Sequence, residues 1–598
     1  MAKKREEFDN VYKWNTKDLF KSETDFKKEI EKLNKDIRKI KKYQNRIMDN
    51  PNTLLELLNL DTSLGRRIER VYIYAHTNND ADTKNVKFQE LFGIARNLYA
   101  SYIELSSFIV PEILKADYDK ILDFIKREPK LNDYKLNLKD IFRNKKHVLS
   151  EDAEAALSIV SKISSAPDEI IGVLTDSDFT FEPIMVNEKK TELNESNFSV
   201  FLKDKNRTVR ESAFKSIYKT YENFKTTISA ILKNEVDKNI SYSKVRGYKS
   251  SLERSLFANE IPVSVYNNLI ESVHKNLKPL YKYFELKKKN LGLKDIHIYD
   301  TYTDISDIQR KYSFDEAKEL VLEVVKPLGN DYVKNITKSF TDRWIDSCNN
   351  DGKRGGAYCT ACYDTHPYVL MSFEGTLSDV STLAHELGHA MHYYYACNNQ
   401  LYQNYNYSIF VAEVASQVNE ILLSRYLLDH TSDSKEKLKL IDDLLQKYKS
   451  TIYRQTMFAE FEKFIHEYAE NGGILTHEVM CNKYYDLNKL YFGDNVVCDD
   501  EIRYEWERIP HFYMNFYVYQ YATGFAASVY LANKIYENDT KTRDKYLKFL
   551  SLGSTKNPID SLKVAGVDMT KSEVMDEAIC YMNELLKEYE LLGSEIDG

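Results

Sequence analysis

The chain has 598 residues, of which 43% are hydrophobic and 29% are charged, and its net charge is −8. This composition is typical of a globular protein too long for one hydrophobic core, and it excludes a disordered chain. Lys and Arg are interleaved with Asp and Glu, which argues against a nucleic-acid partner. No apolar run approaches the roughly 20 residues of a membrane span, and none follows the basic start, so we expect a cytoplasmic protein without a secretory signal.

Glycine (19) and proline (11) are scarce, which favours long helices over a turn-rich β architecture. From Phe26 to Met48, apolar residues recur at helical spacing among charged ones and predict an amphipathic helix with one buried stripe. That stripe could pack within the chain or form a coiled coil with a partner; its short length favours the first. Helical patterns continue through Leu54–Leu64 and Gln89–Ile109.

A break in the helical pattern occurs at Thr180–Glu195 (TFEPIMVNEKKTELNE), which contains Pro183 and many polar residues. We take it as a domain boundary that separates an N-terminal helical domain, residues 1–195, from a second domain, residues 196–598. Helices resume at Thr208–Ala230, where Arg207 and Arg210 suggest a charged helix face.

Two short strands are predicted near residue 360, in a segment with four glycines. Ala357–Tyr363 and Tyr368–Phe373 alternate or run apolar as strands do. The fold class is therefore mainly α, with a small β-sheet directly before the helix that starts near Ser378. The segment also holds a CxxC pair, Cys359 and Cys362, which could be a redox motif or half a zinc site. Without a second CxxC or a helix start, ordinary strand cysteines are favoured.

The helix after these strands contains HELGH, which is His385 to His389. Two histidines at i and i+4 lie on one helix face, so both imidazoles can reach one zinc ion. Glu386 would lie beside that ion, where it can take a proton from the attacking water. A cap is expected at Ser378 or Asp379. The expected buried stripe consists of Leu383, Leu387 and Ala390.

His392 lies on the same helix, seven residues after His385 and about 10 Å along the axis, too far for both to bind one ion. We therefore expect it to support the site from behind or to face substrate. A catalytic zinc usually has three protein ligands. The next helix, after a polar loop at Tyr393–Tyr407, supplies Glu413 as the expected third ligand. Gln417 and Glu420 share its face.

Glu420 and Asp379 are candidates to orient the histidines through hydrogen bonds. A solvated position is equally consistent with Glu420. Further on, PHFYMNFYVYQYATG holds His511 with Tyr513, Tyr517, Tyr519 and Tyr521. A hydroxyl donor there could stabilise a developing oxyanion, although aromatic residues at helical spacing more often form core.

At these residues the chain resembles a known family, the oligoendopeptidase F branch of the thimet oligopeptidase-like zinc metallopeptidases. The resemblance covers most of the chain and follows one order of motifs. These are YKWNTKDLF, KRGGAYCTACYDTHPYVLMSFEGT leading into DVSTLAHELGHAMH, FVAEVASQVNE and IPHFYMNFYVYQYATG.

The resemblance implies a two-lobed helical fold with a deep channel that admits unfolded oligopeptides. It maps the metal ligands onto His385, His389 and Glu413, and the general base onto Glu386. It maps the oxyanion and substrate contacts onto His511, Tyr517 and Tyr521. It also implies that Gly355, Gly356, Ala357 and Tyr358 form an edge strand that pairs with peptide backbone. Residues 196–598 would then be the catalytic domain.

The expected function is that of a zinc metallo-endopeptidase with one Zn²⁺ per chain and oligopeptides as substrates. A site of two histidines and one glutamate can also accept cobalt or manganese. Two alternatives stay open at this stage: a zinc carboxypeptidase, which would need a cation for the terminal carboxylate, and a non-catalytic peptide-binding protein with structural zinc. The oligomeric state is left open.

Overall fold

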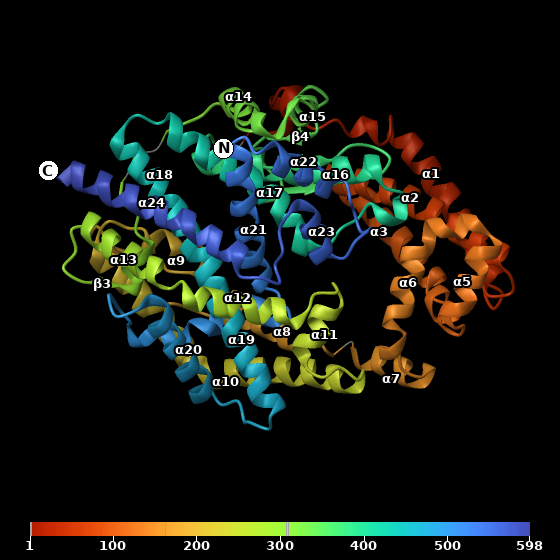
Figure 1. Cartoon of the computed structure of the whole chain (residues 1–598), viewed down its shortest axis with the longest axis horizontal. Coiled ribbons are helices and arrows are strands. Elements are labelled where there is room, and N and C mark those ends of the chain that lie inside the picture. Colours follow the sequence, from red (N-terminus) through yellow and green to blue (C-terminus); the bar gives the residue numbers. More distant parts are fainter. Residues whose placement is uncertain (1–2, 162, 307, 309, 598) are drawn as a thin grey trace. The chain divides into compact units, whose positions relative to one another are not determined.

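The computed structural model describes residues 3–161, 163–306, 308 and 310–597, with the side chains of residues 151 and 597 left aside. Helices dominate these residues and the strands are short (Figure 1), so the predicted mainly α class is confirmed. Within the described part of the chain, no helix is both long and apolar enough to cross a membrane.

The chain forms two compact units, each built from segments distant in sequence. Within the described residues, the first unit takes in the chain up to Lys146, then 310–423 and Leu531–Gly566. The second takes in residues 147–308, Ser424–Tyr530 and the chain from Val567 onward. Each unit is made of three separate segments of the chain, so neither unit is one continuous range of residues. The division into domains at residue 195 therefore stays a prediction.

The helices of the N-terminal half are α1 (Glu23–Asp36), α2 (Pro51–Ala81), α3 (Val86–Ser106), α4 (Ile109–Leu114), α5 (Tyr118–Arg127), α6 (Lys135–Asn144), α7 (Glu151–Ser161), α8 (Ala166–Val173), α9 (Glu195–Leu202), α10 (Arg207–Val245), α11 (Ser251–Phe257), α12 (Val263–Lys275) and α13 (Lys278–Asn290). Those of the C-terminal half are α14 (Phe314–Val324), α15 (Asn330–Thr341), α16 (Leu377–Asn399), α17 (Ile409–His430), α18 (Ser434–Tyr448), α19 (Arg454–Glu470), α20 (His477–Phe492), α21 (Tyr519–Tyr536), α22 (Thr540–Leu550), α23 (Pro558–Ala565) and α24 (Glu573–Asp597).

The stripe predicted from Phe26 onward is buried, as expected for an amphipathic helix. Phe26 and Leu33 are fully buried on α1, and Ile40 is fully buried after it. The α-helix ends at Asp36, however, and Ile37–Tyr43 continues as a 3₁₀ helix. The stripe joins a core cluster with α2, α3 and the strand Tyr368–Leu370, so it packs within its own chain.

A three-stranded sheet precedes α16 in the first unit. Its strands β4 (Ile345–Asp346), β6 (Tyr368–Leu370) and β5 (Tyr358–Thr360) lie in the order β4-β6-β5. The central strand β6 is fully buried, pairs in parallel with β4 and antiparallel with β5, and α16 contacts both β5 and β6. The predicted small sheet beside this helix is therefore confirmed, and β5 lies at its edge.

The other strands form two-stranded pairs. β1 (Ile184–Val186) and β2 (Lys189–Thr191) make a hairpin within the predicted boundary segment. β3 (Ile296–His297) pairs in parallel with β7 (Val496–Val497).

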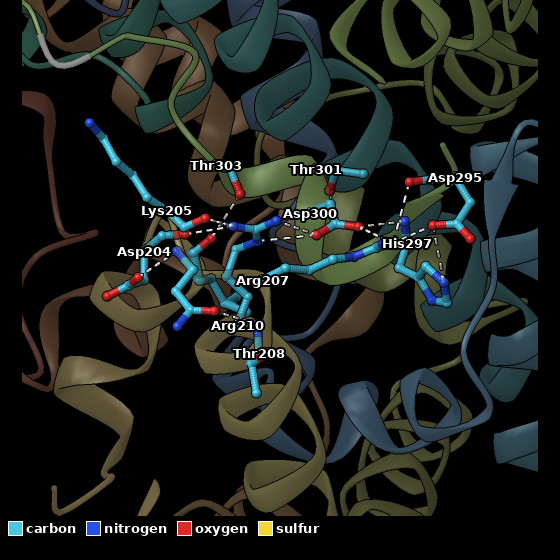
Figure 2. Close-up of polar contacts among 12 residues, drawn as sticks. Asp204, Lys205, Arg207, Thr208, Arg210, Asp295, His297, Asp300, Thr301 and Thr303 are labelled. Carbon is cyan, nitrogen blue, oxygen red and sulfur yellow. Dashed lines mark hydrogen bonds and ion pairs between the residues drawn. The ribbon is translucent and has the colours of Figure 1, made fainter. Parts of the chain in front are cut away.

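Arg207 and Arg210, predicted to form a charged helix face, have partners in the second unit instead. Figure 2 shows the Asp300 carboxylate between the two guanidinium groups, and Arg210 binds it at 2.6 Å with only 2% of its surface exposed. Arg207 reaches both Asp300 at 2.9 Å and Asp295 at 2.7 Å. The first turn of α10 is thereby tied to the 3₁₀ helix Ile298–Tyr302, because a buried carboxylate needs such partners.

Cys359 lies in β5, and Cys362 lies two residues after the end of that strand. Both are free thiols. Burial raises the pKa of Cys362 to about 12 and that of Cys359 well above its usual value. Thiols that stay protonated are neither reactive nor ready metal ligands. The raised pKa values of both thiols therefore support the interpretation as ordinary cysteines over a redox motif or half a zinc site.

Candidate active site

Helix α16 begins two to three residues earlier than expected. Its N-cap is Thr376, whose hydroxyl accepts a hydrogen bond from the Asp379 backbone at 3.1 Å, while the Asp379 carboxylate accepts one from the Thr376 backbone at 2.9 Å. The prediction of Ser378 or Asp379 as the cap is therefore wrong. Asp379 occupies the third position of a capping box. Its carboxylate is engaged there and does not orient a histidine.

Gly388, inside HELGH, marks the closest approach of α16 and α17. A Cβ atom at this position would lie 2.6 Å from the carbonyl oxygen of Ala415 and 2.6 Å from the Cα of Ser416. Across the same contact, the buried amide of Asn419 donates a hydrogen bond of 3.0 Å to the carbonyl oxygen of Ala384. Glycine is needed because the two backbones touch, and this contact sets the spacing between the histidines and α17.

His385, His389 and Glu413 come together at this contact. Each offers one ligand atom, and these atoms lie within 4.8 Å of one another, the one such group found among the described residues. The Nε2 atom of His385 is 3.6 Å from Glu413 Oε2, and that of His389 is 3.7 Å from Glu413 Oε1. Two imidazoles and one carboxylate form the donor set of many catalytic zinc sites.

Behind this group, Glu420 holds His385 in place. Its carboxylate lies 2.7 Å from His385 Nδ1 and accepts a hydrogen bond of 2.9 Å from the hydroxyl of Ser381. Such a carboxylate fixes the tautomer that leaves Nε2 free for a metal. Glu420 is thus engaged with the histidine, and the alternative of a simply solvated side chain is wrong.

The pKa values of the two histidines shift in opposite directions. Burial alone would lower the pKa of His385, but the hydrogen bond and the charge of Glu420 raise it above its usual value. Burial and the neighbouring His385 lower the pKa of His389 to about 3, so His389 is neutral near pH 7. A divalent cation and a proton would compete for His385.

Glu386 is only 6% exposed, beside the three candidate ligands. Burial, followed by the repulsion of Glu413 and Glu420, raises its pKa to about 7, although His385 opposes the shift. Its Oε2 atom is buried and has no hydrogen-bond partner among the described residues. A carboxyl group with a pKa near the working pH suits proton transfer in both directions.

His392 does not face substrate, contrary to one expectation. It is 1% exposed, with its ring stacked on Tyr407 at 3.6 Å and tilted against Phe549 at 5.3 Å. It is a core residue behind the candidate metal site. The loop expected at Tyr393–Tyr407 is also shorter than predicted, because α16 continues to Asn399. The predicted stripe of Leu383, Leu387 and Ala390 is fully buried, as expected.

His511, Tyr517 and Tyr521 form a cluster within the second unit. His511 Nε2 lies 3.3 Å from the Tyr521 hydroxyl, and the ring centroids of Tyr517 and Tyr521 are 5.5 Å apart. Tyr517 precedes α21, which begins at Tyr519, so Tyr517 and Tyr521 do not lie on one turn of the same helix although they are four residues apart. Tyr519, 2% exposed, packs against Tyr266. Tyr519 is therefore a core residue, whereas His511, Tyr517 and Tyr521 form the cluster.

The turn before Tyr517 depends on Glu462, a residue whose role no sequence motif indicated. Asn515 and Phe516 both have positive φ (48° and 60°), a conformation that non-glycine residues rarely adopt. The fully buried Glu462 of α19 accepts a hydrogen bond from the Phe516 backbone, and Ser255 donates one to the Asn515 carbonyl. Sequence periodicity gives Glu462 a buried position on α19, but only the fold brings it to this turn.

The strand predicted to bind substrate is linked to α2 by a hydrogen bond. The Tyr358 hydroxyl donates a hydrogen bond of 3.0 Å to the buried Asp80, which Arg354 and His76 also contact. Gly355 and Gly356 precede the strand, are exposed, and Gly356 has a φ of +85°. The edge strand β5 is Tyr358–Thr360, so of the four residues expected to form it only Tyr358 does, and Gly355, Gly356 and Ala357 lead into it.

Comparisons with known proteins give matches over most of the chain. The model of "Peptidase family M3" matches residues 200–581, and that of "Oligopeptidase F" matches residues 112–181. Oligopeptidase PepF of Bacillus subtilis is 41% identical over 97% of this chain and 87% of its own length. Group B oligopeptidase PepB of Streptococcus agalactiae is 38% identical over 99% of each chain. The solved oligoendopeptidase-F from Enterococcus faecium matches with a TM-score of 0.73 and 33% identity, over 95% of this chain and 99% of its own.

Proposed function

Because this chain belongs to peptidase family M3 and is therefore a metallopeptidase, we propose that it is a zinc-dependent oligoendopeptidase. It would hydrolyse internal bonds of short, unfolded peptides, with the cytoplasm as the predicted compartment. The observation that carries the proposal is the convergence of His385, His389 and Glu413 within 4.8 Å, with Glu386 buried beside them.

The donor set fits zinc, and cobalt or manganese would bind the same atoms. His385, His389 and Glu413 would hold the ion. When bound, zinc supplies Lewis-acid polarisation of the scissile carbonyl and of the attacking water. Closed structural sites normally have four protein ligands, so three ligands beside an unpartnered glutamate favour catalysis over a structural role.

The chain's own groups account for the proton transfers. Glu386 takes the proton of the attacking water and passes it to the amine that leaves. The pKa of about 7 that burial gives this carboxyl allows both steps near neutral pH. Glu420 keeps the His385 ring in its orientation through the 2.7 Å contact with Nδ1.

From the second unit, we assign His511, Tyr517 and Tyr521 the task of donating hydrogen bonds to the developing oxyanion. Support comes from their clustered polar tips and from the resemblance to the family. The pKa of His511 is lowered by burial, so the ring is neutral at pH 7 and can donate from one nitrogen.

We further assign peptide binding to Gly355, Gly356, Ala357 and Tyr358. Because β5 is the edge strand of its sheet, an extended peptide could add to it by main-chain hydrogen bonds. Such bonds do not depend on the side chains of the peptide, which suits an enzyme that cleaves varied sequences.

The test is mass spectrometry of products from a mixture of short peptides, with and without a zinc chelator. Internal cuts that stop with chelator and return with added zinc are the expected result. Stepwise loss from the C-terminus would indicate a carboxypeptidase on the same site. Absence of cleavage by the zinc-loaded protein would refute the enzymatic proposal and favour a peptide-binding protein.

A further inference from the structure

A second recognition feature lies in the first unit, between α2, α3, α4 and α6. A cavity of about 1180 Å³ opens there, of a size that would hold a peptide residue and its neighbours. One face of α2 lines it with Asp61, Ile68, Glu69 and Tyr72, which follow helical spacing. Nothing in the proposed catalytic mechanism uses this cavity.

Its wall is aromatic, and part of that wall is open to solvent. Tyr72, Tyr99, Tyr102, Tyr134 and Tyr402 all line the cavity. Tyr99 is 48% exposed, and Ile103 and Val110, which also line it, are exposed to a similar degree. Exposed apolar side chains gathered around a concave site are typical of a binding surface.

Two residues that line the cavity, Asp61 and Asn137, each keep an acceptor oxygen without a partner among the described residues. Asp61 Oδ1 accepts a hydrogen bond of 2.7 Å from Tyr102, while Oδ2 has none to a described residue. Asn137 donates its amide to the Gln403 carbonyl at 3.1 Å, so its buried Oδ1 atom is left without a partner among the described residues. Both acceptors would be satisfied by a ligand that donates hydrogen bonds.

The cations near the cavity do not neutralise Asp61. Arg66 pairs with Asp364 and lies over the Tyr363 ring. Arg96, the cation among the described lining residues, is exposed and lies 5.9 Å from the Phe92 ring centroid. An acceptor carboxylate among tyrosine rings is the usual chemistry for binding an ammonium or guanidinium group.

A row of stacked rings joins this cavity to the edge strand. Tyr358 of β5 stacks on His76 at 5.5 Å, His76 on Tyr72 at 5.8 Å, and Tyr72 contacts Tyr99 at 6.1 Å. An extended peptide advances about 3.3 Å per residue, so these three steps together correspond to at most about five residues. One peptide could therefore lie on β5 and reach the cavity.

We propose that this cavity is a distal subsite for the oligopeptide, which binds a cationic group within about five residues of the residue opposite Tyr358. The group is an ammonium or guanidinium, supplied by the peptide's amino terminus or by a Lys or Arg side chain. Asp61 and Asn137 accept its hydrogen bonds, and Tyr72 and Tyr99 flank it. This inference rests on the proposed peptide substrate, but it concerns binding and does not require cleavage.

The test measures peptide binding by fluorescence anisotropy to the zinc-loaded Glu386→Gln variant, in which turnover is blocked. The probes are labelled alanine-rich peptides of about ten residues, long enough to span β5 and the cavity. One carries a Lys with acetylated terminus, one a norleucine in its place, and one a free amino terminus without Lys. Tighter binding of the Lys peptide than of the norleucine peptide would identify a side chain as the source of the charge, and tighter binding of the peptide with a free amino terminus would identify that terminus.

We expect a cationic peptide to bind about tenfold more tightly than the norleucine peptide, as one charged hydrogen bond would give. Adding Asp61→Asn should abolish that preference, whereas Glu90→Gln, which removes an exposed charge from α3, should keep it. Tyr99→Ala, at an exposed position, should weaken binding of all three peptides. Equal affinities for all three peptides, or a preference that survives Asp61→Asn, would overturn the inference.

These outcomes are separable from the proposed hydrolysis. If the wild-type protein cleaves no peptide but a cationic peptide still binds preferentially through Asp61, the subsite stands and the catalytic proposal fails. If cleavage proceeds normally but binding ignores charge, the catalytic proposal stands and the subsite fails.

Discussion

At the residue scale, Glu386 combines burial with an unusual pKa. Replacing it by Gln removes the proton acceptor but none of the three candidate metal ligands. We expect zinc content to match the wild type, while kcat falls by at least about a hundredfold, the usual contribution of a general base. Metal analysis and peptide turnover on the same preparation check this. A variant with near wild-type kcat would show that another group takes the proton.

Glu420 contacts the candidate ligand His385 through Nδ1, so removing its carboxylate should weaken zinc binding without removing a group that takes part in proton transfer. For Glu420→Ala we expect zinc to bind about 10- to 100-fold more weakly, because the His385 ring loses its anchor. Competition with a chromophoric chelator measures this affinity. Glu420→Gln, which keeps an acceptor oxygen, is the matched control and should lose less. Unchanged zinc affinity in the alanine variant would contradict the orienting role.

Tyr521 is the tyrosine whose hydroxyl lies near His511. Tyr521→Phe should lower kcat about tenfold or more with zinc content unchanged, as expected when one oxyanion donor is lost. Tyr513→Phe makes the same chemical change in the same segment and should leave kcat close to the wild type. Steady-state kinetics of both variants decide whether Tyr521 is catalytic or only packs.

At the element scale, the contact between α16 and α17 brings the candidate metal ligands together. A methyl group at Gly388 would collide with the backbone of Ala415 and Ser416, and backbone cannot rotate away. Gly388→Ala should therefore lower the free energy of unfolding by about 1–3 kcal/mol and reduce zinc binding as the helices separate. Denaturant unfolding and metal analysis measure the two effects.

Gly93 on α3 provides the control for this change. A Cβ atom there would meet nothing within 4 Å, and the residue is exposed. Gly93→Ala should leave stability unchanged or raise it by up to about 1 kcal/mol, since alanine favours helix. If Gly388→Ala behaved like Gly93→Ala, the close approach of the helices would not constrain the site.

At the scale of the whole molecule, buried carboxyls make stability depend on pH. Burial raises the pKa of Glu462 from its usual 4.5 to about 8. Between these values the folded chain holds a proton that the unfolded chain has lost, so this group lowers the free energy of unfolding as pH rises from about 4.5 to 8. Below that window its contribution is fully present, and above it that contribution is lost.

Glu462→Gln removes this titration but keeps an acceptor for the Phe516 backbone. The variant should gain stability relative to the wild type as pH rises from 5 to 8, measured by denaturant unfolding at both values. Glu467→Gln, at an exposed position on the same helix, should follow the wild-type pH dependence. Parallel pH profiles for Glu462→Gln and wild type would show that Glu462 does not titrate in this range.

Much of this molecule follows from local sequence. Histidines at i and i+4 share a helix face wherever the helix forms, so His385 and His389 could be paired from the sequence. The stripes on α1 and α16 and the two short strands could be predicted because they depend on periodicity along one segment. The order of several motifs was enough to indicate the family before any geometry was known.

Other features depend on segments distant in sequence, and local patterns do not encode their meeting. Sequence could not decide whether Glu420 was solvated; the packing of α17 against α16 places it on His385. His392 is buried because Tyr407 and Phe549 cover it, and Tyr517 leaves the helical register at a turn that Glu462 stabilises. The cavity at Asp61 likewise exists only where four helices meet. The chemistry of the side chains was present in the sequence, but their distances and burial arose from tertiary packing.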